Sequence, residues 1–232
     1  MKKGVQKIYH EVARTYEFVN HVLTIGFDSL WRKRAAQIAL NSKGKYWLDM
    51  CTGTGNMVKL LSKQKRKNVR IVAADFNPSM IALANERYRS SHVYFCLSDA
   101  KSMPFENETF DLIIIAFATR NIDSNENRLK MHFQEFHRLL KPGGKFINLE
   151  TSQPPNPFVR RCFYFYAKYI VRFLGFLLSG SRSGYRYLSH TLPRFYDQRS
   201  LTNILKKSGF SFVESKRLFL GIAAIHIANK QI

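Results

Sequence analysis

Two glycines and an acidic residue mark the part of the chain best suited to bind a nucleotide. Residues Leu48–Asn56 read LDMCTGTGN, and Gly53 and Gly55 follow an apolar run that reaches Asp49. Glycine has no Cβ, so a ligand can approach the backbone of such a turn closely. The dinucleotide-binding fingerprint has a third glycine where this chain has Val58. Because Gly-x-Gly alone is also typical of ordinary turns, this segment needs support from elsewhere in the chain.

Two further acidic residues, each after a later apolar run, provide that support. Asp75 follows the run Val69–Ala74 and lies 20 residues after Gly55, and Asp99 follows the run Val93–Leu97. A carboxylate at Asp75 can accept hydrogen bonds from both hydroxyls of a ribose. A carboxylate at Asp99 can accept a hydrogen bond from the amino group of an adenine. Either aspartate alone is as readily a helix cap or a turn residue. Acidic residues after three successive runs favour a nucleotide site.

The elements that must position these residues follow from the order of apolar and helical segments. Short apolar runs without strict alternation are separated by helical segments, which is typical of a parallel sheet buried on both faces. We therefore expect an α/β fold, a doubly wound and mostly parallel sheet with a C-terminal antiparallel hairpin, which binds ligands at the carboxyl ends of its strands. The expected strands are 46–50, 69–74, 93–97, 111–117, 145–150, 211–219 and 222–228, and the expected helices after the first strand are 56–64, 78–88, 126–140 and 200–208.

The chain of 232 residues is interpreted as a single domain with one insertion. Two helices are expected within residues 5–40, the second capped by Asp28 or Ser29, and a turn is expected at Lys141–Gly144. We divide the chain into an N-terminal helical cap, a cofactor-binding α/β core, a basic aromatic insertion that faces substrate or membrane, and a closing helix with its hairpin: residues 1–44, 45–150, 151–196 and 197–232.

The charge of the chain predicts an anionic partner. Lysine and arginine number 37 against 16 aspartates and glutamates, a net charge of +21, which suits nucleic acid or an acidic membrane surface, although a generally basic proteome would produce the same excess. Residues 151–196 contain seven basic and twelve aromatic residues and no acidic one. The stretch Phe158–Leu178 suits the headgroup layer of a membrane, and it equally suits a core-facing helix with snorkelling basic side chains. Because Lys168 and Arg172 interrupt it, we expect this stretch to lie in the interface and not to span the membrane.

The cysteines and histidines point to no metal and to no disulfide framework. The three cysteines are an odd number spread too widely for a CxxC motif, and the seven histidines lack the spacing of metal ligands. The N-terminus has no apolar core behind its lysines, so no secretory signal is expected. These features favour a protein of the reducing cytoplasm.

Four motifs in this order, LDMCTGTGN, AADFNPSM, SDAKSMPF and LKPGG, resemble those of the class I S-adenosylmethionine-dependent methyltransferases. The segments VARTYEFVNHVLTIGFDSLWRKR, FATRNIDS, SGYRYLSHTL and GIAAIHIANK narrow the resemblance to the quinone C-methyltransferases, which make menaquinone and ubiquinone. The resemblance implies S-adenosylmethionine as cofactor and a prenylated quinol as substrate. Thr52, Asn56, Ala116 and Glu17 depart from the family's pattern. With the glycine loop included, the expected cofactor-binding residues are Asp49, Gly53, Thr54, Gly55, Asp75, Asp99 and Ala100.

Methylation of a ring carbon needs a nucleophilic carbon in line with the sulfonium methyl. A hydroquinone becomes strongly nucleophilic when a hydroxyl beside that carbon loses its proton, so the protein should stabilise a phenolate or help to remove the proton. We expect Arg120 and Asn121, after the fourth strand, to serve this step, although Arg120 could instead form a surface ion pair with Asp123 or Glu126. In the aromatic segment, Tyr185 could cover the ring and His190 could be the base, although a lone histidine is more often structural.

Two other classes of function remain as alternatives. An RNA or other nucleic-acid methyltransferase would also use basic and aromatic residues, but amino-methylating enzymes commonly carry Asn/Asp-Pro-Pro-aromatic after the fourth strand, where this chain has Ala-Thr-Arg-Asn. A binding module without turnover is the other alternative. We expect methylation of demethylmenaquinol, with the benzoquinol precursor of ubiquinone left open, at the inner face of the membrane and without nucleic acid; self-association is left open.

Overall fold

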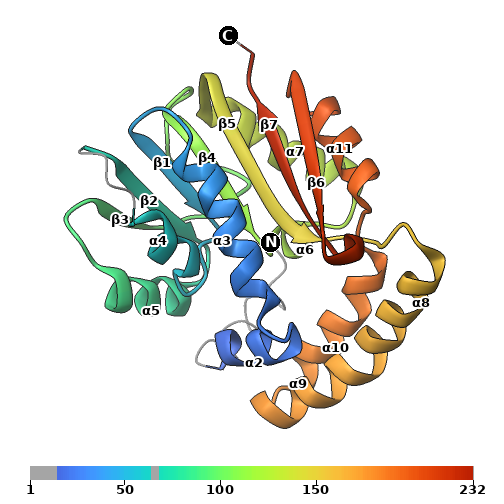
Figure 1. Cartoon of the computed structure of the whole chain (residues 1–232). Helices are drawn as coiled ribbons and strands as arrows, with labels where there is room; N and C mark the ends of the chain where they lie inside the picture. Colours follow the sequence, from blue (N-terminus) through green and yellow to red (C-terminus); the bar gives the residue numbers. More distant parts are fainter. Residues whose placement is uncertain (1–14, 64–67, 232) are drawn as a thin grey trace.

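A seven-stranded sheet forms the centre of the molecule (Figure 1), with the strand order β3-β2-β1-β4-β5-β7-β6. The computed structural model describes residues 15–63 and 68–231. Strands β1 to β5 are parallel, and β6 and β7 pair antiparallel at one edge, which confirms the predicted sheet. The strands are β1 (Tyr46–Met50), β2 (Arg70–Asp75), β3 (Val93–Leu97), β4 (Phe110–Ala116), β5 (Leu140–Thr151), β6 (Phe212–Leu218) and β7 (Ala223–Asn229).

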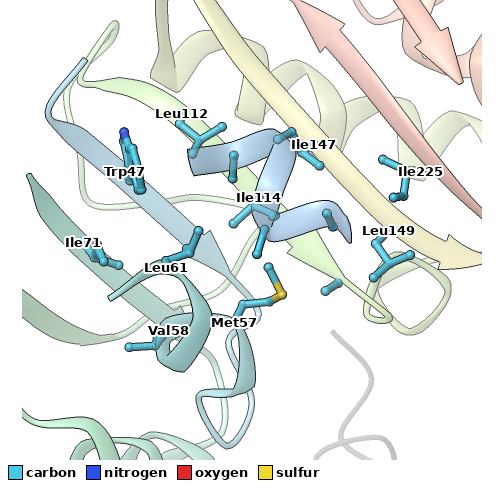
Figure 2. Close-up of a cluster of buried hydrophobic side chains, with 14 of the residues drawn as sticks. Trp47, Met57, Val58, Leu61, Ile71, Leu112, Ile114, Ile147, Leu149 and Ile225 are labelled. Atoms are coloured by element: carbon cyan, nitrogen blue, oxygen red, sulfur yellow. The ribbon is translucent and has the colours of Figure 1, made fainter. Parts of the chain in front are cut away.

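Helices cover both faces of the sheet. Helices α3 and α4 pack their apolar side chains on one face, and α7 and α11 pack on the other. Figure 2 shows the first face, where Val58 and Leu61 of α4 lie against Ile71 and Ile114 of the strands. The helices of the sheet layers are α3 (Phe27–Leu40), α4 (Asn56–Leu61), α5 (Pro78–Tyr88), α6 (Thr119–Ile122), α7 (Glu126–Leu139) and α11 (Gln198–Lys207).

A separate helical layer lies at the end of the sheet where β5 runs into α8 (Figure 1). It has its own hydrophobic cluster, to which Val19 and Leu23 of α2, Phe163 of α8 and Tyr185 of α10 contribute. We call these helices the helical layer; its members are α2 (Tyr16–Leu23), α8 (Pro157–Phe165), the π-helix η1 (Tyr166–Val171), α9 (Arg172–Ser179), α10 (Arg182–Thr191) and the 3-10 turn η2 (Leu192–Arg194).

The helix that runs from α8 through η1 to α9 buries one narrow stripe. Phe163, Ala167, Val171 and Gly175 are buried at intervals of four residues. Such a stripe drifts around an α-helix by about 40° per step, because an α-helix turns by about 100° per residue. The more slowly wound π-helix in the middle counteracts that drift. The remaining faces, which carry Phe158, Phe173 and Leu177, are exposed.

This helix bears on one expectation drawn from the sequence. Residues Pro157–Ser179 form 23 helical residues with a mean hydropathy of 1.2 in their most apolar window, so by length and composition alone the segment could cross a membrane. Length and composition therefore do not exclude a spanning segment by themselves, and its absence stays a prediction. In this structure the helix packs by its buried stripe against the other members of the helical layer.

Several elements also differ from prediction, most of the remaining bounds by only one to a few residues. The second helix begins at Phe27, because Gly26 has a φ of +78° that ends the preceding turn, and Asp28 lies in the first turn and not at the cap. Residues Lys141–Gly144 belong to β5 and form no turn, since the β4–β5 register shifts to accommodate them. Helix α6 was not predicted. The predicted helix 56–64 ends at Leu61. Residues 5–14 lie outside the described residues.

Candidate functional site

The loop between β1 and α4 has the open backbone that its glycines predict. Gly53 has a φ of +58°, and a Cβ built on it would meet no atom within 4 Å, so the space beside it is open. Gly55 has a φ of +88°, and a Cβ there would lie 2.5 Å from the Tyr88 ring. Gly53 therefore gives access to the backbone, whereas Gly55 allows the loop to pack on α5.

Asp75 ties this loop to the end of β2. Its carboxylate accepts hydrogen bonds from the backbone N–H of Gly53 and of Asn77, both at 2.9 Å. Burial raises the pKa of Asp75, although these two hydrogen bonds act to lower it. The loop geometry and the carboxylate thus depend on each other.

Asp49 lies beneath the loop and is 1% exposed. It accepts a hydrogen bond from the hydroxyl of Thr52 at 2.5 Å. Burial raises the pKa of Asp49 to about 7, against the lowering effects of the Thr52 hydrogen bond and the positive charge of Arg32. A carboxyl group that titrates near neutrality therefore lies directly below the glycine turn.

A small cavity of about 60 Å³ opens beside this loop. Gly53, Thr54, Asp75 and Asn121 are among its lining residues, and the Thr54 hydroxyl is buried without a hydrogen-bond partner in the described part of the chain. An orphaned buried hydroxyl and an open glycine backbone fit a bound polar ligand. The other expected cofactor residues, Asp49, Gly55, Asp99 and Ala100, do not line this cavity; Asp99 follows β3 and accepts the backbone N–H of Lys101 at 3.0 Å.

A much larger cavity, of about 470 Å³, lies between the sheet and the helical layer. Its lining is mostly apolar and comes from α2, α3, α8, α10 and the turn η3 (Phe219–Gly221), together with the ends of β4 and β5. Asp28, Arg120 and Tyr187 are among its few polar residues. Burial raises the pKa of the Tyr187 hydroxyl, with the charge of Arg120 acting against that rise.

Arg120 reaches the large cavity from the short helix α6. Its backbone N–H donates to the buried carboxylate of Glu150 at 3.1 Å, and its guanidinium donates to the Thr191 hydroxyl at 2.6 Å. The alternative interpretation, a surface ion pair, is wrong: Asp123 pairs with Arg128, and Glu126 pairs with Lys207. Arg120 is 6% exposed, so its charge is directed into the cavity region.

The remaining predicted residues divide between the two cavities and the surface. Asn121 lines the small cavity and donates from its amide to the carbonyl of Phe117 at 3.3 Å. Tyr185 is buried and lines the large cavity. His190 is exposed, lines neither cavity and lies 2.8 Å from the guanidinium of Arg194. The structure therefore does not bring His190 to the place where a base would act.

Two residues that the sequence did not single out form the boundary between the cavities. Phe117 and Arg32 line both of them. Phe117 has a φ of +58°, a conformation that costs a non-glycine residue roughly 1–3 kcal/mol and that is found mostly at functional sites. Its ring lies 6.1 Å from that of Trp31, and the guanidinium carbon of Arg32 lies 4.9 Å from its centroid. The position of Phe117 directly after the most apolar strand was the available signal.

Among residues 15–63 and 68–231, no group of three histidine, cysteine, aspartate or glutamate side chains is arranged to hold a metal ion.

Known proteins resemble this chain in sequence and in fold. The ubiE/COQ5 methyltransferase family matches residues 1–230. A demethylmenaquinone methyltransferase of Thermus thermophilus is 35% identical over 96% of this chain and 100% of its own length. A ubiquinone/menaquinone biosynthesis C-methyltransferase of Hydrogenovibrio crunogenus is 30% identical over 97% of this chain and 88% of its own length.

Solved structures agree on the fold at lower identity. An S-adenosylmethionine-dependent methyltransferase of Thermotoga maritima has a TM-score of 0.68 and 16% identity, covering 97% of this chain and 100% of its own. A phosphoethanolamine N-methyltransferase of Haemonchus contortus, solved with S-adenosylhomocysteine, has a TM-score of 0.62 and 17% identity, covering 86% of this chain and 52% of its own.

Proposed function

The chain belongs to the ubiE/COQ5 methyltransferase family, and on that basis we propose that it methylates a ring carbon of a prenylated quinol with S-adenosylmethionine as the donor. The product of this reaction on demethylmenaquinol is menaquinol. The observation that carries the proposal is the meeting of two unlike cavities at one strand end, a small polar one and a large apolar one. A polar donor and a prenylated ring need that combination.

The lining of the small cavity suits a polar part of the donor, and its volume of about 60 Å³ holds only part of that molecule. S-adenosylmethionine supplies an electrophilic methyl group, and the residues of the glycine loop hold the molecule that carries it. Asp75 lines the cavity with a buried carboxylate and can accept hydrogen bonds from ribose hydroxyls. The Thr54 hydroxyl and the open backbone at Gly53 offer further polar contacts.

The large cavity suits the acceptor ring and the first part of its tail. A cavity of about 470 Å³ is within the usual range for a small-molecule site, and its apolar walls exclude water from the reacting carbon. The guanidinium of Arg120 can stabilise the negative charge that develops on a quinol oxygen, and it is not the base that accepts the proton. Tyr187 lines the same cavity, and its hydroxyl is a candidate to hydrogen-bond the ring oxygen.

Labelled S-adenosylmethionine tests the proposal when offered with reduced demethylnaphthoquinones, reduced benzoquinones and RNA in parallel. We expect label on a ring carbon of the naphthoquinol, located by mass spectrometry, and none in the RNA. Label recovered in RNA alone, or binding of the donor without turnover on any quinol, would contradict it. Comparison of the two quinol classes decides between the menaquinone and the ubiquinone precursor.

We also propose that the enzyme works in the cytoplasm at the inner face of the membrane. Three considerations support this: the water-insoluble tail of the substrate, the three free cysteines that suit a reducing compartment, and the exposed apolar side chains around the large cavity. Ile25, Phe158 and Leu220 line that cavity and are 83%, 76% and 65% exposed. The neighbouring exposed residues Arg161, Lys168 and Arg172 are basic, as an anionic headgroup layer requires.

Flotation with vesicles tests this part. We expect the protein to float with phosphatidylglycerol vesicles and not with phosphatidylcholine vesicles, and Phe173→Ser to reduce the bound fraction several-fold. Phe173 is 65% exposed on α9, whereas Tyr94 is 50% exposed on the edge strand β3, so Tyr94→Ser is the matched control and should bind as the wild type does. Equal loss in both variants, or no binding by the wild type, would contradict the proposal.

A further inference from the structure

Arg32 is a charged side chain without a partner at the junction of the two cavities. It lies on α3, is partly buried, and lines both the small and the large cavity. Its Nε is buried and makes no hydrogen bond, and in the described part of the chain the guanidinium forms no ion pair. Its guanidinium carbon lies 4.9 Å from the centroid of the Phe117 ring. A buried donor without an acceptor is costly, so this group is placed for an acceptor that a ligand supplies.

The other charges near the small cavity are already engaged. Arg120 lines only the large cavity and donates to Thr191. Arg32 is the one basic residue among the described residues that line the small cavity. Asp75 accepts hydrogen bonds from the backbone N–H groups of Gly53 in the loop and of Asn77 after β2. The small cavity therefore combines one acidic residue at the end of β2 with one free cation on α3.

Asp49 influences Arg32 without satisfying it. The positive charge of Arg32 acts on the Asp49 carboxyl, so the two groups are near enough to interact electrostatically. Asp49 accepts its hydrogen bond from Thr52 and does not line the cavity, and no hydrogen bond joins it to Arg32. The attraction to Asp49 holds the guanidinium beside the small cavity. Its N–H groups remain available to a ligand.

We propose that Arg32 binds the α-carboxylate of the methionyl part of the methyl donor, an assignment that rests on the proposed function. Asp75 takes the ribose at one end of the small cavity, so the amino-acid end lies away from it, toward Arg32 and the large cavity. A guanidinium matches a carboxylate with two parallel hydrogen bonds, and the Phe117 ring, whose centroid lies 4.9 Å from the guanidinium carbon, gives this group a cation–π contact. Arg32 thereby sets the position of the sulfonium relative to the acceptor ring.

Calorimetry with three ligands tests this assignment directly. S-adenosylmethionine and S-adenosylhomocysteine both carry the carboxylate, whereas 5′-methylthioadenosine lacks the amino-acid part. We expect Arg32→Gln to weaken the first two by roughly 10–100-fold and to leave the third unchanged, since hydrogen bonds to a charged group are lost. Arg32→Lys should recover part of the affinity because the charge remains.

The matched control is Arg34→Gln on the exposed side of the same helix, which should change none of the three affinities. Equal weakening of all three ligands by Arg32→Gln would mean that Arg32 shapes the cavity without contacting the carboxylate. Unchanged donor affinity with slower methylation would place the anion on the quinol instead. Either result overturns the assignment, whereas a wild-type protein that binds no S-adenosylhomocysteine overturns the proposed function itself.

Discussion

The small and large cavities are built in opposite ways. The lining of the small cavity comes, apart from Arg32, from short segments at the ends of β1, β2 and β4, where backbone N–H groups and carboxylates hold fixed positions. The large cavity is assembled from α2, α8, α10 and η3, which are far apart in the chain, and polar groups are few. If the donor binds in the small cavity and the acceptor in the large one, as proposed, individual polar bonds recognise the donor, whereas shape and exclusion of water select the acceptor.

That difference makes the two sites separable by mutation. A polar change on the small-cavity side should alter donor affinity alone, whereas a change of volume on the large-cavity side should alter acceptor kinetics alone. On the proposed function, the negative charge that develops on the quinol oxygen has few polar partners in the large cavity besides Arg120. Removal of Arg120 should therefore impair the reaction strongly.

Arg120→Ala should therefore have the largest effect. We expect the turnover number to fall roughly 100-fold, the usual loss when one donor to a developing oxyanion is removed, with donor affinity unchanged. Steady-state kinetics and calorimetry measure the two quantities. Thr191→Val is the control, since it removes the hydroxyl that Arg120 contacts and keeps the guanidinium. If both variants lost turnover equally, the Arg120–Thr191 contact and not the charge would be the essential element.

Asp75→Ala should act on the other cavity. We expect the dissociation constant for S-adenosylmethionine to rise by roughly 10–100-fold, because hydrogen bonds to a charged acceptor and the hold on Gly53 are both lost. Asp111→Ala is the matched control, since Asp111 also accepts two backbone N–H groups, from Lys45 and Tyr46 at 2.9 Å, at the opposite end of β1. Donor affinity should survive that change. If Asp75→Ala left donor affinity intact, Asp75 would not belong to the donor site.

Gly175→Ala tests whether shape controls the large cavity. A Cβ at Gly175 would lie 2.1 Å from the ring of Tyr185, which lines the cavity, so the ring must move. We expect a loss of about 1–3 kcal/mol in the free energy of unfolding and a several-fold higher Michaelis constant for the quinol. Gly180→Ala is the control for destabilisation without a clash, since its Cβ would meet nothing within 4 Å while its φ of +72° is unfavourable for alanine. A changed donor affinity in Gly175→Ala would show that the two cavities are coupled.

Asp49→Asn should affect catalysis least, and its expected effect lies in the pH dependence of stability. Burial raises the pKa of Asp49 from 3.8 to about 7, so between these values the folded protein binds a proton that the unfolded chain releases. The stabilising contribution of this group is full below about pH 4 and is lost as the pH rises to about 7. Urea unfolding across that range should show a flatter profile for the variant, with a difference below about 1.4 kcal/mol per pH unit. Parallel profiles would mean that Asp49 titrates normally.

The sequence predicts the elements around the small cavity better than those around the large one. The strands β1 and β3 and the helix α5 have the predicted bounds, because local apolar runs and an Asn-Pro start determine them. The Gly53–Asp75 pairing could be anticipated, since parallel strands bring their carboxyl ends to one edge. The strand conformation of Lys141–Gly144 could not be anticipated. Its glycines indicate a turn, but a shift in the β4–β5 register accommodates these residues within β5.

The acceptor side was less predictable for a physical reason. Tyr185 was expected to cover the ring and does line the large cavity, whereas His190, five residues further along α10, is exposed. Which face of that helix meets the cavity depends on its packing against α9, where Gly175 leaves room for Tyr185. Such contacts between distant segments leave no local pattern, and for the same reason the place of Arg32 between the cavities could not be foreseen.

The separate hydrophobic cluster of the helical layer has a consequence for how this enzyme can diversify. Val19, Phe163 and Val171 pack on one another and not on the sheet, so substitutions among them reshape the acceptor wall while the strands keep their register. Selection can therefore retune the choice of ring or tail through this layer alone, and an engineer seeking a new acceptor should randomise it and leave the glycine turn intact.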